Sequence, residues 1–377
     1  MLGLTHVSMR CLHWGNPPSC TNRKFAVTLR HCLHIWADMQ SARKLRWNLR
    51  SLGLSDTIID AAWPEWWSEA AEASTSAQSE LRFSIARKLG LDPKSLLEDQ
   101  PRFVWRDEAK FKRLTSESEI ERSALASFGI SVGRALLSAT PWSGEEVSAE
   151  PEMYRELILR RRQFITLEDL MALCWGIGIP VVYLRVFPLR AKKMNAMVVR
   201  IDGRFAILLA RDANFPAPIA FYLAHELGHA ALGHIKGHAA VVEFGDLLID
   251  RQNASDDEET AADRYALELL TGMSAPRFVP EGSGFNAPAI ANAVLQHAQD
   301  LHIEPGVMAL CFGYSTGAWQ RVFAALKMIY SAPLPVWMAV NRVAFDQLDW
   351  TLLNDDTRHF LNTVMGGEQR DKHRAGQ

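Results

Sequence analysis

The spacing of apolar and polar residues predicts helices in the first part of the chain. Residues 39–53 place apolar and basic side chains at helical spacing, and "LSDTIIDAAW" follows as a short helix with Ser55 as its N-cap. A third, strongly amphipathic helix in "SAQSELRFSIARKLG" ends at Gly90. The pair Asp92-Pro93 then starts another turn. Residues 39–100 are therefore predicted to be helical.

The middle of the chain adds strands to this helical pattern. The predicted elements are, in order, a helix over 118–138, a linker over 141–151, a helix in "FITLEDLMALCWGIGI", a strand over 180–187, two strands within 196–211 and a helix that starts near Pro216. The two strands flank Asp202-Gly203, a pair typical of tight hairpin turns. The pattern predicts an α+β fold that is mostly helical, with a small sheet.

The composition fits a globular protein. It argues against general binding of polyanions and against a membrane-spanning protein. The chain has 377 residues, of which 48% are hydrophobic and 22% charged, so it is long enough for two or three domains with a buried core. A net charge of -2 gives no overall attraction to polyanions, so any contact with nucleic acid would be local. No apolar run approaches the length of a membrane span, and we expect no membrane partner.

Cysteine usage indicates a reducing compartment. The five cysteines are Cys11, Cys20, Cys32, Cys174 and Cys311. Their odd number, wide spacing and lack of a CxxC pair argue against a disulfide framework and against a cysteine-based zinc site. We therefore expect a cytoplasmic protein.

Residues 1–38 differ from the rest of the sequence. They hold three of the cysteines, show no sustained period and lack the apolar segment and cleavage site of a signal peptide. The regular pattern begins at Met39. We predict that residues 1–38 are a disordered extension that arises from an upstream start codon; a short basic arm is the alternative.

The order of the first helices resembles a Cro/CI-type helix-turn-helix domain, and "IARKLGLDPKSLL" is similar to the end of such a domain. Where a recognition helix would offer hydrogen-bonding side chains to base edges, however, this chain has Glu65, Trp66, Trp67, Glu69 and Glu72. Carboxylates oppose contact with phosphates. We favour a helix-turn-helix scaffold that docks protein over one that binds DNA. A plain helical bundle with the tryptophans in its core is a third interpretation.

The stretch "AFYLAHELGHAALGH" carries the strongest chemical signal. His225 and His229 are four residues apart, so one face of a helix can direct both imidazoles at one ion. Glu226 lies beside them, where a carboxylate can take a proton from a water molecule next to that ion. The alternative is an amphipathic helix with incidental histidines. The small residues around the motif and the strands before it favour a zinc site.

A peptidase zinc needs a third protein ligand. The spacing HExxHxxGxxH would supply it from a histidine, but Gly233 comes one residue too late and His234 one too early. We therefore expect His234 to act as a cation at the helix end, and His238 to lie on the following loop.

The predicted helix "DDEETAADRYALELL" offers the better third ligand. Glu259 and Asp263 are four residues apart and share a face. Glu259 can bind the ion, while Asp263 accepts the second N–H of a ligand histidine. Asp257 and Glu258 leave the choice of ligand open by one residue, and the ExxAD spacing favours Glu259.

These segments together resemble the ImmA/IrrE-type metallopeptidases of bacteria. The matching pieces are "GIPVVYL", "RIDGRFAILLA", "LAHELGHAALGH", "EETAADRYALELL" and "IEPGVMALCFGY". The resemblance covers about the middle half of the chain. It implies a gluzincin-like zinc endopeptidase with a zincin-like core, which binds one Zn²⁺ per chain and cleaves a helix-turn-helix repressor in a stress, mobile-element or defence response. One departure is "LLTGMSAP", where family members often have "LLMP".

The resemblance leads to a division of the chain and to a set of roles. We expect an extension (1–38), a helix-turn-helix-like domain (39–100), a helical connector and linker (101–150), the zinc peptidase core (151–280) and a helical C-terminal region (281–377). His225, His229 and Glu259 would bind zinc, and Glu226 would act as general base. Tyr222 is a candidate for substrate contact or oxyanion stabilisation, whereas Tyr265 is expected in the core. The alternatives are a toxin–antitoxin component with structural zinc and a DNA-binding regulator.

Overall fold

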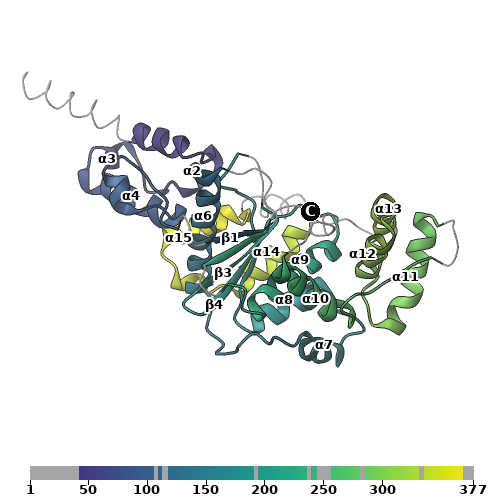
Figure 1. The fold of residues 1–377 in the computed structure, drawn as a ribbon. Helices are drawn as coiled ribbons and strands as arrows, with labels where there is room; N and C mark the ends of the chain where they lie inside the picture. Colours follow the sequence, from purple (N-terminus) through teal and green to yellow (C-terminus); the bar gives the residue numbers. More distant parts are fainter. Residues whose placement is uncertain are drawn as a thin grey trace, which may run out of the picture.

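The computed structural model is mostly helical and contains a small mixed sheet, which confirms the predicted α+β class (Figure 1). It describes residues 42–105, 109–112, 118–190, 194–235, 239–243, 256–280, 285–330 and 335–367. The extension predicted over 1–38 and His238 lie outside these residues. None of the described helices is long and apolar enough to cross a membrane.

Five short strands form the sheet, in the order β1, β5, β3, β4, β2. Their bounds are Ala109–Lys112 for β1, Val181–Tyr183 for β2, Ala196–Ile201 for β3, Arg204–Leu209 for β4 and Ala240–Glu243 for β5. β3 pairs antiparallel with both β4 and β5, whereas the outer pairs β1–β5 and β2–β4 are parallel. The predicted hairpin is confirmed, with Asp202 and Gly203 both at positive φ in its turn. β1 and β5 were not expected from the sequence.

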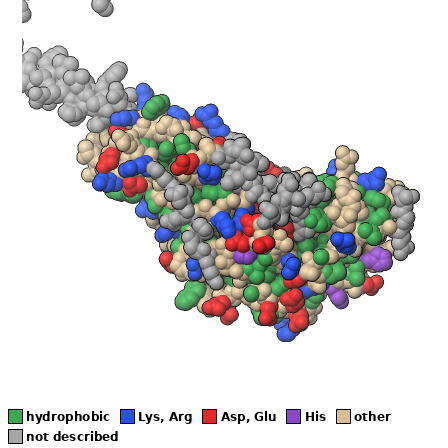
Figure 2. Space-filling model, viewed as in Figure 1, with side chains coloured by type: hydrophobic (Ala, Val, Ile, Leu, Met, Phe, Trp, Pro, Cys, Tyr) green, Lys and Arg blue, Asp and Glu red, His purple; other side chains and the backbone are tan. Residues whose placement is uncertain are grey.

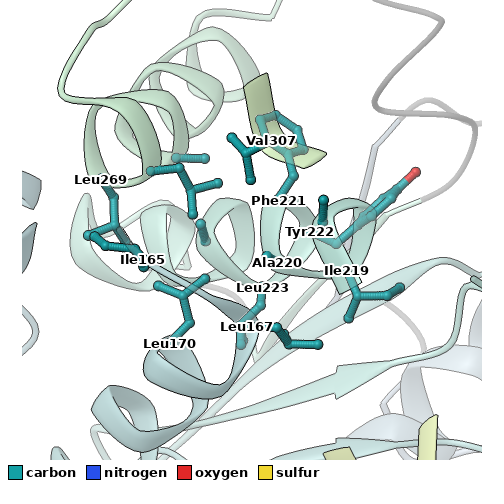
Figure 3. Packing of buried hydrophobic residues seen from close by; sticks show 14 of the residues in the cluster. Ile165, Leu167, Leu170, Ile219, Ala220, Phe221, Tyr222, Leu223, Leu269 and Val307 are labelled. Carbon is teal, nitrogen blue, oxygen red and sulfur yellow. The ribbon is translucent and has the colours of Figure 1, made fainter. Parts of the chain in front are cut away.

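One face of the sheet is covered by the helices that carry the predicted zinc motifs. Alternation along the strands turns Val181, Val198, Ile207 and Val241 toward this face. α8 (Leu167–Gly176) and α9 (Pro216–Ala231) contact the strands directly. α10 (Asp257–Thr271) and α12 (Pro305–Thr316) pack on α9, and α7 (Pro151–Leu159) packs on α10. α9 lies at their centre and contacts β3, β4, α8, α10 and α12. Figure 3 shows its apolar side chains packed between those of α8, α10 and α12.

The opposite face packs on α6 (Glu119–Ser138), whose start has the capping box of Ser118 and Glu121. Met197, Val199, Leu208 and Val242 share a core with this helix and with the N-terminal helices. Residues 101–150 therefore supply a strand and a covering helix to the sheet, in addition to the irregular linker before α7.

The N-terminal region is a set of short helices, as predicted. After a helical stretch over 42–51 come α2 (Asp56–Ala62), α3 (Glu69–Glu72), α4 (Thr75–Leu89) and α5 (Pro93–Leu97). Ser55 caps α2, Gly90 ends α4, and Asp92 caps α5. At the place of a recognition helix there is only the four-residue α3. The described residues at this position therefore form no helix long enough to lie along a major groove.

Helices of the C-terminal region pack against α9 and α10 on one side and against α6 and the N-terminal helices on the other. α11 (Ala287–Leu301), α12 and α13 (Trp319–Ile329) pack together at the side of α9 and α10 (Figure 1). α14 (Val336–Gln347) packs on β2, and Asn341 bonds both the N–H and the C=O of Tyr183. After a short 3₁₀ turn (Trp350–Leu352), α15 (Asp355–Val364) contacts α2, α4 and α6.

An ion pair joins α4 of the N-terminal region to α15. Lys88 of α4 is 2% exposed, and its Nζ lies 2.5 Å from Oδ1 of Asp356 in α15. The same ammonium donates to the carbonyl of Ala62 at 2.9 Å. The helix-turn-helix-like region therefore shares one hydrophobic core with α15 and the sheet, and it is continuous with the rest of the fold.

The adjacent tryptophans before α3 have different surroundings. Trp67 is half-buried against the core, and its ring meets those of Trp63 and Trp66 edge-on at centroid distances of 6.3 and 5.9 Å. Trp66 is 41% exposed. One tryptophan is thus a packing residue, and its neighbour presents indole surface to solvent.

Candidate metal centre

α9 brings His225, Glu226 and His229 into the interior between the sheet and α10. It begins with Pro216 at its first turn, and nearly all of its residues are buried because it is surrounded by packed elements. All three side chains of the motif are fully buried. The Nε2 atoms of His225 and His229 lie 3.0 Å apart, so the helical spacing directs both imidazoles at one point.

Gly228 allows α10 to approach α9 closely. A Cβ at this position would lie 3.2 Å from both the carbonyl oxygen of Ala262 and Cβ of Tyr265. At this approach, the carboxylate of Glu259 lies 3.6 Å from Nε2 of His225 and 3.3 Å from Nε2 of His229. The glycine inside the motif thus lets the two helices bring their functional groups together.

Glu259, and not Glu258, faces the histidines. Glu258 is directed to the sheet edge, where it forms ion pairs with Lys110 and Lys112. These ammonium groups hold the pKa of Glu258 at about 2, although its partial burial alone would raise it. Lys112 is 3% exposed and also lies 3.5 Å from Oε1 of Glu259. The lysines of β1 therefore fix the first turn of α10 against the sheet.

Each motif histidine has a second polar partner behind it. Oδ1 of Asp263 lies 3.0 Å from Nδ1 of His225, as the ExxAD spacing predicted. Such a carboxylate fixes the tautomer that leaves Nε2 free to bind a metal. The shared face of Glu259 and Asp263 therefore serves two atoms of the same centre.

The expectation for His234 was wrong. Gly233, at φ 72°, turns the chain after α9 and brings Nδ1 of His234 to 2.9 Å from Nδ1 of His229. Burial and the neighbouring His229 lower the pKa of His234 to about 4. The residue is therefore a neutral partner that orients His229, and it does not act as a cation at the helix end.

Glu243 is a fourth group in the centre, and the sequence reasoning missed it. It ends β5, and its side chain is fully buried. One carboxylate oxygen lies 3.9 Å from Nε2 of His225 and 3.6 Å from Nε2 of His229, distances too long for hydrogen bonds. A detectable signal was the short run "AVVE", in which alternation places Glu243 on the same face as Val241.

Negative charge is concentrated at this point of the interior. Among the described residues, neither carboxylate oxygen of Glu226 or of Glu243 has a hydrogen-bond partner. Burial first, and Glu243 next, raise the pKa of Glu226 to about 8. Burial alone would lower the pKa of His225, but the carboxylates of Asp263, Glu243 and Glu259 raise it well above its usual value. The site favours a bound positive charge, which either protons or a metal cation can supply.

The donor set fits a tetrahedral metal ion. Ligand atoms of His225, His229, Glu243 and Glu259 all lie within 4.8 Å of one another. A tetrahedron with metal–ligand bonds of about 2.0–2.1 Å has ligand separations of about 3.3–3.4 Å. The five separations given above run from 3.0 to 3.9 Å. Two imidazoles and two carboxylates are donors that zinc accepts, so this buried cluster could hold a metal ion.

The hydroxyls of Tyr222 and Tyr265 have hydrogen-bond partners outside the cluster of histidines and carboxylates. Tyr222 is fully buried, and its hydroxyl oxygen accepts a hydrogen bond from Arg211 at 2.8 Å; Figure 3 shows this hydroxyl pointing away from the packed aliphatic side chains. The hydroxyl of Tyr265 donates to the carbonyl of Ser148 at 3.0 Å, and the residue belongs to the core, as predicted. Neither tyrosine is thereby supported as an oxyanion donor.

A groove of about 600 Å³ lies between α9, α10, α12 and α13. Phe221, Leu267 and Trp319 give it apolar walls, and Asp263 lines its side toward the histidines. The departure "LLTGMSAP" contributes Ser274, Ala275 and Pro276 to the lining. The segment that differs from the resembled family thus lines this groove.

The charged surface near the centre is local. Figure 2 shows acidic and basic side chains side by side in the middle of one face, near the region of β1 and α9 in Figure 1. Comparisons of the chain with protein-family models, with curated proteins and with solved structures found no match.

Proposed function

We propose that the protein is a zinc-dependent endopeptidase. The observation that carries the proposal is the convergence of His225, His229 and Glu259 on one buried point, with Glu226 beside them. Two histidines and a carboxylate are a donor set of catalytic zinc sites. The resemblance to the ImmA/IrrE-type metallopeptidases in the same segments supports the same activity.

Different residues of the chain have different roles in the proposed amide hydrolysis. A zinc ion held here would lower the pKa of a water molecule and polarise the scissile carbonyl. Glu226 takes the proton of the attacking water and returns it to the leaving nitrogen. Asp263 and His234 hold His225 and His229 in the orientation that directs Nε2 at the ion. The interior position of these groups strengthens each electrostatic contact.

The proposed substrate is a helix-turn-helix repressor. This part of the proposal rests on the resemblance, and two features of the molecule are compatible with it. The apolar groove lined in part by Asp263, the partner of His225, can receive side chains of an extended chain segment. The N-terminal helices expose Trp66 and Glu69 where a DNA reader would have a recognition helix, so they suit protein contact better than phosphate contact.

Glu226→Gln tests the enzymatic function. The amide cannot accept a proton, so we expect cleavage of a peptide library, followed by mass spectrometry, to fall by about 10²- to 10⁴-fold. Zinc content should stay at the wild-type level because Glu226 is outside the set of ligands. Equal cleavage by this variant and the wild type would rule out Glu226 as the base.

A non-catalytic zinc protein is the second candidate. The observation that favours it is Glu243, because a centre with four protein ligands is typical of structural zinc. In that case the wild type and Glu226→Gln would both bind zinc, and neither would cleave any peptide.

A further inference from the structure

The sheet holds Glu243 in the metal centre. β5 pairs on one side with β3, where Glu243 is opposite Ala196, and on the other with β1, where it is opposite Lys112. Its carbonyl also accepts a hydrogen bond from the N–H of Asn195 at 2.9 Å. The backbone of Glu243 is therefore fixed by two neighbouring strands, and its side chain reaches the histidines from a rigid position.

The surroundings of the Glu243 carboxylate favour a bound cation. It is fully buried, and among the described residues its oxygens have no hydrogen-bond partner. Burying a carboxylate is costly unless an opposite charge or a metal compensates it. The groups near it with that capacity are Nε2 of His225 and of His229, at 3.9 and 3.6 Å from Oε1. These distances are too long for hydrogen bonds and somewhat longer than the edge of a zinc tetrahedron, which is about 3.3–3.4 Å.

We propose that Glu243 is a fourth metal ligand that occupies the coordination position needed by the attacking water. Three protein ligands and one open position define a catalytic zinc site, whereas four protein ligands close it. The fold described here would then be a latent form of the enzyme, in which the ion is held but water is kept off it. Hydrolysis requires that the Glu243 side chain leaves the ion. This proposal rests on the proposed metallopeptidase function.

Cobalt substitution tests the closed site without relying on activity. The full-length protein and Glu243→Gln are loaded with Co²⁺ alone and titrated with acetohydroxamic acid, which binds a metal only where a position is open. We expect little change in the visible absorption of the wild type and a clear shift in the variant, with hydroxamate affinity at least about tenfold higher. Glu243→Ala serves as a second variant, because a glutamine amide oxygen could still approach the ion.

Glu258→Gln is the matched control. It removes a carboxylate from the same junction of α10 and the sheet, but Glu258 pairs with Lys110 and Lys112 and does not face the histidines. It should respond to hydroxamate as the wild type does. Circular dichroism melts establish that each protein is folded.

Two outcomes would overturn the role of Glu243 alone. The first is a wild-type cobalt spectrum that responds to hydroxamate as strongly as the Glu243→Gln spectrum does. The second is loss of cobalt from both folded Glu243 variants, since His225, His229 and Glu259 should hold the ion without it. Failure of the wild type to bind cobalt or zinc at all would overturn the metallopeptidase proposal as well, so the two failures are distinguishable.

Peptide cleavage adds a second readout. If Glu243 keeps water off the ion, Glu243→Gln should cleave faster than the wild type, by about fivefold or more. Slower cleavage together with an unchanged cobalt spectrum would overturn the proposal and give Glu243 a part in proton transfer.

Discussion

The helices α3 and α10 both carry carboxylates in their first turn, yet only those of α10 form a centre. In α3, Glu69 is exposed and Glu72 half-buried. In α10, Glu259 is buried against two histidines and Glu258 against two lysines. A negative charge at a helix N-terminus is favourable in either case, by about 0.3–1 kcal/mol. The local preference is the same, and the difference comes from the elements opposite each helix.

The elements opposite α10 are β1, β5 and α9. β1 brings Lys112 to Asp256 and Glu258 at 2.5 and 3.0 Å, and α9 brings the imidazoles to Glu259. α3 packs on α4, where the side chain of Gln78 donates to the backbone carbonyl of Glu72, but among the described residues neither Glu69 nor Glu72 forms an ion pair. An acidic helix start becomes a site only where packing places cations or ligand groups against it.

Removal of a motif histidine should have the largest effect on zinc binding at α10. His225→Ala and His229→Ala each take away one imidazole ligand, so zinc content should fall from about one ion per chain to below about 0.1. Atomic emission of the purified proteins measures this. His297→Ala is the control, because His297 is exposed on α11. Full zinc occupancy in both ligand variants would show that the site is misassigned.

Exchange of neighbouring carboxylates in α10 should have the next largest effect. Glu259→Gln weakens a ligand, and we expect zinc affinity to fall by about 10- to 100-fold in chelator competition. Glu258→Gln loses ion pairs with Lys110 and Lys112 and should change zinc affinity less than about threefold. The reverse result would show that Glu258 is the zinc ligand and that Glu259 only stabilises the fold.

The zinc affinity should also depend on pH. The pKa of His225 and His229 is raised in the metal-free centre, because nearby carboxylates outweigh burial, and that of Glu226 is raised to about 8. Protons therefore compete with zinc below these pKa values, and affinity should rise from pH 6 to pH 8. For each proton displaced the rise is about tenfold per pH unit. A zinc affinity that does not change between pH 6 and pH 8 would show that zinc displaces no protons from His225, His229 and Glu226.

The sequence predicted the parts of the centre that follow a local period. Helical spacing placed His225 with His229, and Glu259 with Asp263, and the Asp202-Gly203 pair placed the hairpin. It did not predict β1 or β5, since "AKFK" and "AVVE" are too short for a period to distinguish strand from loop. Glu243 and Lys112 belong to these strands, and a parallel pairing between distant segments brings them to the centre. Alternation in "AVVE" can indicate which face Glu243 shares with Val241, but it cannot indicate which distant strand β5 pairs with.

The role of His234 shows the same limit on a smaller scale. Its place after α9 suggested a charge at the helix end, but the left-handed turn at Gly233 directs it back to His229. Likewise, the sequence predicts the same role for Trp66 and Trp67, whereas in the structure Trp67 packs on the core and Trp66 is exposed.

The smallest expected effects concern these tryptophans beside α3. Trp67→Ala removes a ring that packs on the core, so it should lower the free energy of unfolding by about 1–3 kcal/mol, whereas Trp66→Ala should change it by less than about 0.5 kcal/mol. Chemical denaturation measures both changes. If Trp66 belongs to a docking surface, Trp66→Ala should impair cleavage of a folded repressor and spare cleavage of a short peptide, because only the folded protein can contact the exposed indole. Salt-sensitive binding of duplex DNA by the full-length protein, with discrimination among sequences, would instead assign this region to DNA and would show that a four-residue α3 suffices for it.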